Sequence, residues 1–238
     1  MTTLLALLAL GKAPNTLAVG GLLVANYDKG KWSVCPSTKP TWKSVAFTHI
    51  GIGTLGPTVN VPGAIIMEMS GMPYLDLRER PLNETLWNGP KPAFPRKLAV
   101  TSKPDKATQE LILEIARVNG KVKPVAKSWL AVKGDFDGNG KAETLVFASS
   151  VSEVTIHDES AWNTVQLVVG PHKAYQLAWN ASQGQDEGVV NTFISAVADF
   201  NRDGVYEIVL SNWYHEGNGG QVFTMKAGKP VKVIENGS

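Results

Sequence analysis

Two short acidic loops constrain this chain more than any other feature of its sequence. The first reads Asp135-Phe-Asp-Gly-Asn-Gly-Lys-Ala-Glu143, and the second reads Asp199-Phe-Asn-Arg-Asp-Gly-Val-Tyr-Glu207. Both carry oxygen-bearing side chains at positions 1, 3, 5 and 9 and a glycine at position 6. Apolar residues flank each loop, and the two first positions are 64 residues apart. The chain therefore contains an internal repeat of apolar strand, acidic loop and apolar strand.

The residue types at these positions predict that both loops bind calcium. Ca²⁺ is a hard cation that takes about six to eight oxygen ligands, and three carboxylates in one loop repel one another unless a cation neutralises them. The glycine at position 6 permits the positive φ that bends the chain around an ion. Position 7 is expected to contribute only its backbone carbonyl. The predicted ligands are Asp135, Asp137, Asn139, Lys141 and Glu143 in the first loop and Asp199, Asn201, Asp203, Val205 and Glu207 in the second.

Other metals and the EF-hand fit these loops less well. Position 12 is Val146 or Leu210, so the bidentate glutamate that closes an EF-hand is missing, and the flanks are strand-like. Mg²⁺ resists direct ligation by this many carboxylates, and zinc or iron would call for histidine or cysteine in the loops. The remaining alternative is that the Asp-Gly and Asn-Gly pairs simply make turns. The repetition of the same ligand positions argues against it.

The strings Gly134-Asp-Phe-Asp-Gly-Asn-Gly-Lys-Ala-Glu-Thr-Leu-Val146 and Ala198-Asp-Phe-Asn-Arg-Asp-Gly-Val-Tyr-Glu-Ile-Val209 resemble FG-GAP/VCBS-type repeats. These are the calcium-loop repeats of integrin α-chain propellers and of many bacterial surface proteins. The resemblance covers only the C-terminal half of the chain. It implies a calcium ion held between adjacent strands for stability and not for catalysis. Two repeats are too few to close a propeller, which needs about four blades or more.

The rest of the sequence predicts a mainly β fold of antiparallel sheets, with α+β as the alternative. The second half has strand-like runs that form hairpins across Gly170-Pro171 and Ala227-Gly-Lys229. The one clear helix is expected over Ser102–Val118, with Ser102 as N-cap and Pro104 in the first turn. Prolines are dense between residues 71 and 104, and this stretch is expected to be loop, edge strand or linker.

These patterns divide the chain into three parts. Residues 1–16 contain a short apolar run that is too short to span a bilayer, and they read either as a secretion signal or as an apolar N-terminal segment. Residues 17–100 form a β-rich region with a proline-rich end. Residues 101–238 hold the helix and the two repeats with acidic loops.

Composition and missing motifs narrow the function classes. The net charge of +2 and the scattered basic residues argue against nucleic-acid binding. The single cysteine, Cys35, excludes a disulfide framework within the chain. The sequence has neither His-Glu-x-x-His nor Gly-x-Ser-x-Gly, and no catalytic residue is assigned.

The sequence therefore predicts a calcium-binding, non-enzymatic protein that is secreted, periplasmic or on the cell surface. Calcium would stabilise an adhesion, matrix or assembly module with a protein or glycan partner, or one that assembles with itself. One alternative is a secreted polysaccharide-degrading hydrolase in which calcium is structural. Another alternative is a polymerising surface or filament subunit.

Overall fold

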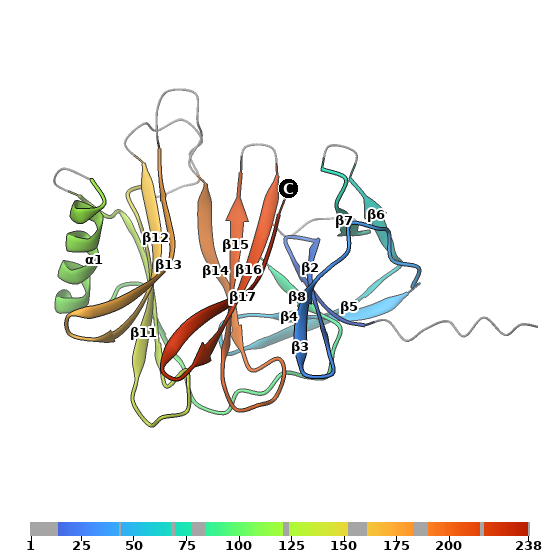
Figure 1. The fold of residues 1–238 in the computed structure, drawn as a ribbon, viewed down its shortest axis with the longest axis horizontal. Coiled ribbons are helices and arrows are strands. Elements are labelled where there is room, and N and C mark those ends of the chain that lie inside the picture. Colours follow the sequence, from blue (N-terminus) through green and yellow to red (C-terminus); the bar gives the residue numbers. More distant parts are fainter. Residues whose placement is uncertain are drawn as a thin grey trace, which may run out of the picture.

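The computed structural model describes residues 14–42, 44–67, 70–77, 84–120, 124–151, 161–182, 190–214 and 217–237. Strands make up 56% of the described residues, so the fold is mainly β with one helix, as predicted (Figure 1). The elements are β1 (Asn15–Val19), β2 (Leu22–Asp28), β3 (Lys31–Val34), β4 (Val45–Ile50), β5 (Leu55–Val61), β6 (Ala64–Ile66), β7 (Pro73–Leu75), β8 (Thr85–Trp87), β9 (Ala99–Thr101), α1 (Lys106–Val118), β10 (Ser128–Gly134), β11 (Glu143–Ser149), β12 (Trp162–Gly170), β13 (Lys173–Ala181), β14 (Asn191–Ala198), β15 (Glu207–Trp213), β16 (Asn218–Lys226) and β17 (Lys229–Gly237).

The strands form three antiparallel sheets. An eight-stranded sheet has the order β5-β4-β8-β1-β2-β7-β6, with β3 beside β2. It curls into a half-barrel that does not close. A five-stranded sheet has the order β13-β12-β11-β10-β9, and a four-stranded sheet has the order β14-β15-β16-β17.

The four-stranded sheet lies between the other two (Figure 1), and side chains from its two faces enter two different hydrophobic cores. Side chains alternate between the two faces of a strand, so Ile208 and Leu210 of β15 join the core shared with the five-stranded sheet. Val209, between them, joins the core shared with the eight-stranded sheet. This double burial explains why Ile208, Val209 and Leu210 form an uninterrupted apolar run in β15.

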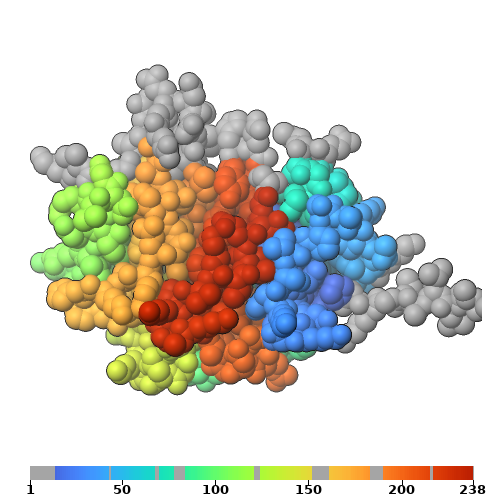
Figure 2. Space-filling view, in the orientation of Figure 1, coloured from blue at the N-terminus to red at the C-terminus, as the bar shows by residue number. Residues whose placement is uncertain are grey.

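The central and curled sheets approach each other closely. β17 contacts β2 and β3, and Figure 2 shows this last strand against the N-terminal strands at the surface. A Cβ atom on Gly220 of β16 would lie 2.7 Å from a methyl carbon of Val24. A glycine at this position therefore allows the two layers to meet.

The two predicted repeats are four-stranded antiparallel meanders, β10–β13 and β14–β17. In both, the acidic loop joins the first strand to the second. The expected hairpins are present, because Gly170 pairs with Lys173 and Lys226 pairs with Lys229. The two blade-like units do not close a ring with the curled sheet, so the prediction of repeats without a closed propeller is confirmed.

Helix α1 starts later than predicted. Its N-cap is Asp105, whose carboxylate accepts a 2.8 Å hydrogen bond from the amide of Thr108. The prediction of Ser102 as N-cap was wrong because a cap there needs helical backbone at Lys103, and the residue before a proline is disfavoured in that conformation. The helix packs Ile112 and Ala116 on the outer face of the five-stranded sheet.

Part of the proline-rich stretch was also predicted wrongly. Strand β8 lies inside the curled sheet, where it pairs with both β1 and β4. No proline falls within Thr85–Trp87, so every amide of this strand can donate to a neighbour. Because of the flanking prolines, the sequence predicted loop, edge strand or linker where the structure has a central strand.

Two of the predicted boundaries along the chain can be compared with the structure. Residues 1–13, most of the expected N-terminal segment, lie outside the described residues, while Asn15 and Thr16 belong to β1 and pair with Tyr27 and Asn26. The boundary near residue 100 falls in β9, and the parts on its two sides share one core. Within the described ranges, no helix has the length and apolar character needed to cross a membrane.

Candidate metal centre

The two acidic loops lie at the same end of the stacked sheets. The first, residues 135–142, connects β10 to β11, and the second, residues 199–206, connects β14 to β15 (Figure 1). They touch each other, because the amide of Tyr206 donates a 3.0 Å hydrogen bond to the carbonyl of Phe136. The two loops are therefore in contact in the fold, although their first residues lie 64 positions apart in the sequence.

The two loops share one hydrogen-bonding pattern. The carboxylate at position 1 accepts from the amides of positions 5 and 6, at 3.1 and 3.1 Å for Asp135 and at 3.1 and 3.0 Å for Asp199. The glutamate at position 9 accepts from the amide of position 2, at 2.9 Å in both loops. The amide of position 7 donates to the side chain of position 5, at 2.7 and 2.8 Å. Different residues at positions 3, 4, 5, 7 and 8 therefore support the same loop conformation.

The backbone at positions 4 and 6 is left-handed in both loops. At position 6, Gly140 and Gly204 have φ of 82° and 89°, as the calcium hypothesis requires. At position 4, Gly138 has φ of 79° and Arg202 has φ of 63°. Residues other than glycine rarely adopt the left-handed backbone region, so Arg202 has a backbone conformation that is unfavourable for its residue type.

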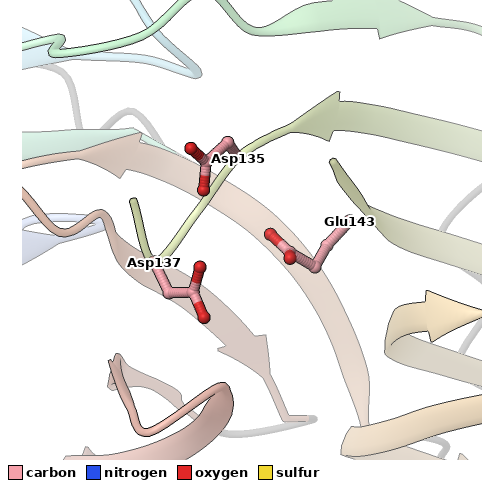
Figure 3. A group of neighbouring side chains, drawn as sticks. All are labelled: Asp135, Asp137 and Glu143. Atoms are coloured by element: carbon pink, nitrogen blue, oxygen red, sulfur yellow. The ribbon is translucent and has the colours of Figure 1, made fainter. Parts of the chain in front are cut away.

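The first loop gathers three of its predicted ligands around one point. One oxygen from each of Asp135, Asp137 and Glu143 lies within 4.8 Å of the other two, and Figure 3 shows the three carboxylates turned toward a common space. Glu143 is buried, while both aspartates are half-buried. Asn139 and Lys141 lie at the exposed rim, where the Asn139 side chain donates to Asp137 at 2.9 Å and accepts from the Lys141 amide.

The second loop arranges its predicted ligands differently. The amide nitrogen of Asn201 donates to Asp203 at 3.0 Å and to Glu207 at 2.8 Å. Within the described part of the chain, only the first loop brings three carboxylates as close together as 4.8 Å. Asp199 and Glu207 are buried, Asp203 is exposed, and Val205 is half-buried. In the second loop, the side-chain amide of Asn201 therefore stands between the carboxylates of Asp203 and Glu207.

Burial shifts the titration of the inner carboxyl groups. Burial, followed by the charges of Asp203 and Asp199, raises the pKa of Glu207 to about 8, although the hydrogen bond from the Phe200 amide opposes the shift. Burial also raises the pKa of Glu143, with Asp137 and Asp135 adding to the effect, and the pKa of Asp199 is raised mainly by burial. A bound cation would favour the ionised forms of all three groups.

The raised pKa of Glu207 predicts how the stability of the metal-free protein depends on pH. Between about pH 4.3, the usual value for an unfolded glutamate, and about 8, the folded state holds a proton that the unfolded state has lost. The free energy of unfolding should therefore fall as the pH rises through this window. Urea unfolding in EDTA at several pH values should show a shallower fall for Glu207→Gln than for the wild type.

A matched control separates this effect from a general loss of carboxylate. Glu110→Gln removes an exposed acid from helix α1, and its profile should follow that of the wild type. If Glu207→Gln kept the wild-type slope, Glu207 would not be the group that holds the proton.

Three aromatic residues and one arginine that the ligand prediction did not include complete the site. At position 2, Phe136 belongs to the core beside the five-stranded sheet and Phe200 to the core beside the curled sheet. At position 8, Tyr206 is fully buried and packs edge-on against Phe136, with ring centroids 6.1 Å apart. Arg96 reaches both loops from outside the repeats. The phenylalanine at position 2 of both loops was the available sequence signal, while nothing in the sequence marked Arg96.

Comparison of the chain with models of known protein families, with curated proteins and with solved structures finds no match in any of the three.

Proposed function

We propose that this chain is a calcium-binding protein in which two cations clamp the ends of neighbouring sheets. The observation that carries the proposal is the shared conformation of the two acidic loops, each closed by a buried glutamate at position 9. In the first loop, three carboxylates already converge on one point. Oxygen ligands around a bend made by glycine suit Ca²⁺ better than zinc or iron.

The clamped module is proposed to work in adhesion, matrix or assembly, outside the cytoplasm, and without catalysis. Each loop lies where two sheets meet, so a cation there ties strands together and leaves the outer surfaces free for a partner. Extracellular calcium modules typically bind in the weak range of about 10⁻⁴–10⁻³ M, and we propose the same range for these loops. The resemblance to FG-GAP/VCBS-type repeats supports the same role.

Calorimetric titration of the chelator-treated protein with CaCl₂ tests the proposal. The wild type should take up two calcium ions per chain, and Asp135→Ala and Asp199→Ala should each take up one. The physical reason is that the carboxylate at position 1 accepts hydrogen bonds from the amides of both position 5 and position 6, and so organises its loop.

The control replaces a side chain at a position that is expected to offer only its backbone. Lys141→Ala alters an exposed side chain of the first loop and should keep both ions. A wild-type protein that takes up no calcium at millimolar concentration would overturn the proposal. Equal uptake of Mg²⁺ in a titration with MgCl₂ would also overturn the proposal, because Mg²⁺ resists direct ligation by several carboxylates.

A further inference from the structure

The two backbone polar groups of Phe136 form hydrogen bonds to different loops. Its amide donates to Glu143, the closing acid of its own loop, at 2.9 Å. Its carbonyl accepts from the amide of Tyr206, which directly precedes the closing acid Glu207 of the second loop, at 3.0 Å. The peptide units on both sides of Phe136 therefore join the closure of one loop to the closure of the other.

The guanidinium of Arg96 bonds to both loops. Its Nε donates to the carbonyl of Asp135 at 2.6 Å, and its Nη2 donates to the carbonyl of Gly204 at 2.7 Å. Its Nε also lies 3.5 Å from the carboxylate of Asp135. The rigid fork of donors in arginine can hold two acceptors in a fixed relation, and here one acceptor belongs to position 1 and the other to position 6.

The backbone of Arg96 is itself held by Tyr206 of the second loop. The hydroxyl of Tyr206 donates to the carbonyl of Arg96 and accepts from its amide at 3.2 Å. The guanidinium carbon lies 5.4 Å from the centroid of the Tyr206 ring. Tyr206 is fully buried, and the Arg96 side chain is 26% exposed, so little water competes with these contacts.

We infer that the two loops form one coupled unit, in which a cation in either loop increases the affinity of the other. This inference rests on the proposed calcium function. Closure of the first loop around an ion fixes Asp135 and Phe136, and these residues hold Arg96 and Tyr206 in place. The second loop is then partly ordered before its own ion arrives, so binding there loses less conformational entropy. By linkage, the effect is reciprocal.

The test compares calcium affinities with the neighbouring site filled and empty. In the wild type, the second loop binds with the first loop filled, while in Asp135→Ala it binds with the first loop empty. We expect its affinity to be about fivefold or more higher in the wild type. Arg96→Met keeps the length of the side chain without its donors, and the ratio of affinities between Arg96→Met and Arg96→Met/Asp135→Ala should fall toward one.

Lys97→Met is the matched control, since it removes one positive charge from the neighbouring, exposed residue and should keep the wild-type ratio. Tyr206→Phe removes only the hydroxyl and gives a second, milder variant that should also reduce the ratio. Equal affinities of the second loop in the wild type and in Asp135→Ala would overturn the coupling while leaving calcium binding intact. A lower affinity in the wild type would overturn it as well, because repulsion between the ions would then dominate.

Hydrogen exchange in chelator separates this inference from the calcium proposal. In the metal-free protein, Arg96→Met should speed exchange of the Tyr206 amide by about fivefold relative to Lys97→Met, because the contacts between the loops do not require an ion. An unchanged Tyr206 amide would overturn the coupling even if calcium binds. Faster exchange in a protein that takes up no calcium would instead overturn the calcium proposal and the coupling of affinities, and would leave only the conformational coupling of the two loops.

Discussion

Phe200→Ala is expected to lower the free energy of unfolding by about 3–5 kcal/mol, as large-to-small changes at buried aromatic residues usually do. Phe200 is 1% exposed. Its ring packs edge-on against Trp87 and Trp32, with centroids 5.4 and 6.3 Å away. These rings belong to the curled sheet, so they cannot follow the truncated side chain without moving that sheet. A cavity should remain at the interface of the two layers.

Urea unfolding in the presence of chelator measures this loss without a contribution from metal binding. Phe193→Ala is the matched control, because it removes the same atoms from a half-buried ring that packs on Phe147 at 5.6 Å. The loss of unfolding free energy should be clearly smaller for Phe193→Ala, since solvent already reaches that ring. Equal losses in the two variants would contradict the assignment of Phe200 to the interface between the sheets.

Calcium should raise the free energy of unfolding by about 2.7 kcal/mol for each filled site at one hundred times the dissociation constant. Two independent sites would give about twice this gain, and coupled sites would reach it at a lower calcium concentration. The reason is that an ion neutralises carboxylates that are buried in the folded protein and solvated in the unfolded chain. Urea unfolding at a series of fixed CaCl₂ concentrations measures the gain.

A variant of each loop should lose part of this gain. Asp199→Ala should lose at least the stabilisation that one bound calcium ion provides, and the loss should be larger if the second loop also supports the first. MgCl₂ at the same concentration controls for ionic strength and charge. An unfolding midpoint that is the same in calcium and in chelator would show that neither loop holds an ion in the folded state.

The features that could be predicted from the sequence are those that depend on residues close together in the chain. The strands on both sides of each acidic loop, the two hairpins and the body of helix α1 follow from side-chain periodicity and turn residues within about a dozen positions. The positive φ of Gly140 and Gly204 also follows from residue type alone. The candidate site could be predicted for the same reason, since the proposed side-chain ligands of each loop lie within nine consecutive residues.

The features that were missed depend on residues far apart in the chain. Strand β8 has three residues and owes its place to pairing with β1 and β4. The stacking of the sheets depends on contacts such as Gly220 against Val24. Arg96 stands in a proline-rich stretch and gains its role only when the fold brings both loops to it. A short-range pattern contains no information about such partners.

The burial of the central sheet also has a consequence for synthesis on the ribosome. The inner face of the curled sheet presents Leu17, Leu22 and Val24, and its cover comes from residues such as Val222 and Ile234 near the other end of the chain. At about 5–20 residues per second, the first of these strands leaves the ribosome on the order of ten seconds or more before its cover exists. Throughout that time an apolar surface is open to chaperones and to other nascent chains. A nascent chain that has not yet produced β16 and β17 therefore leaves part of this surface uncovered.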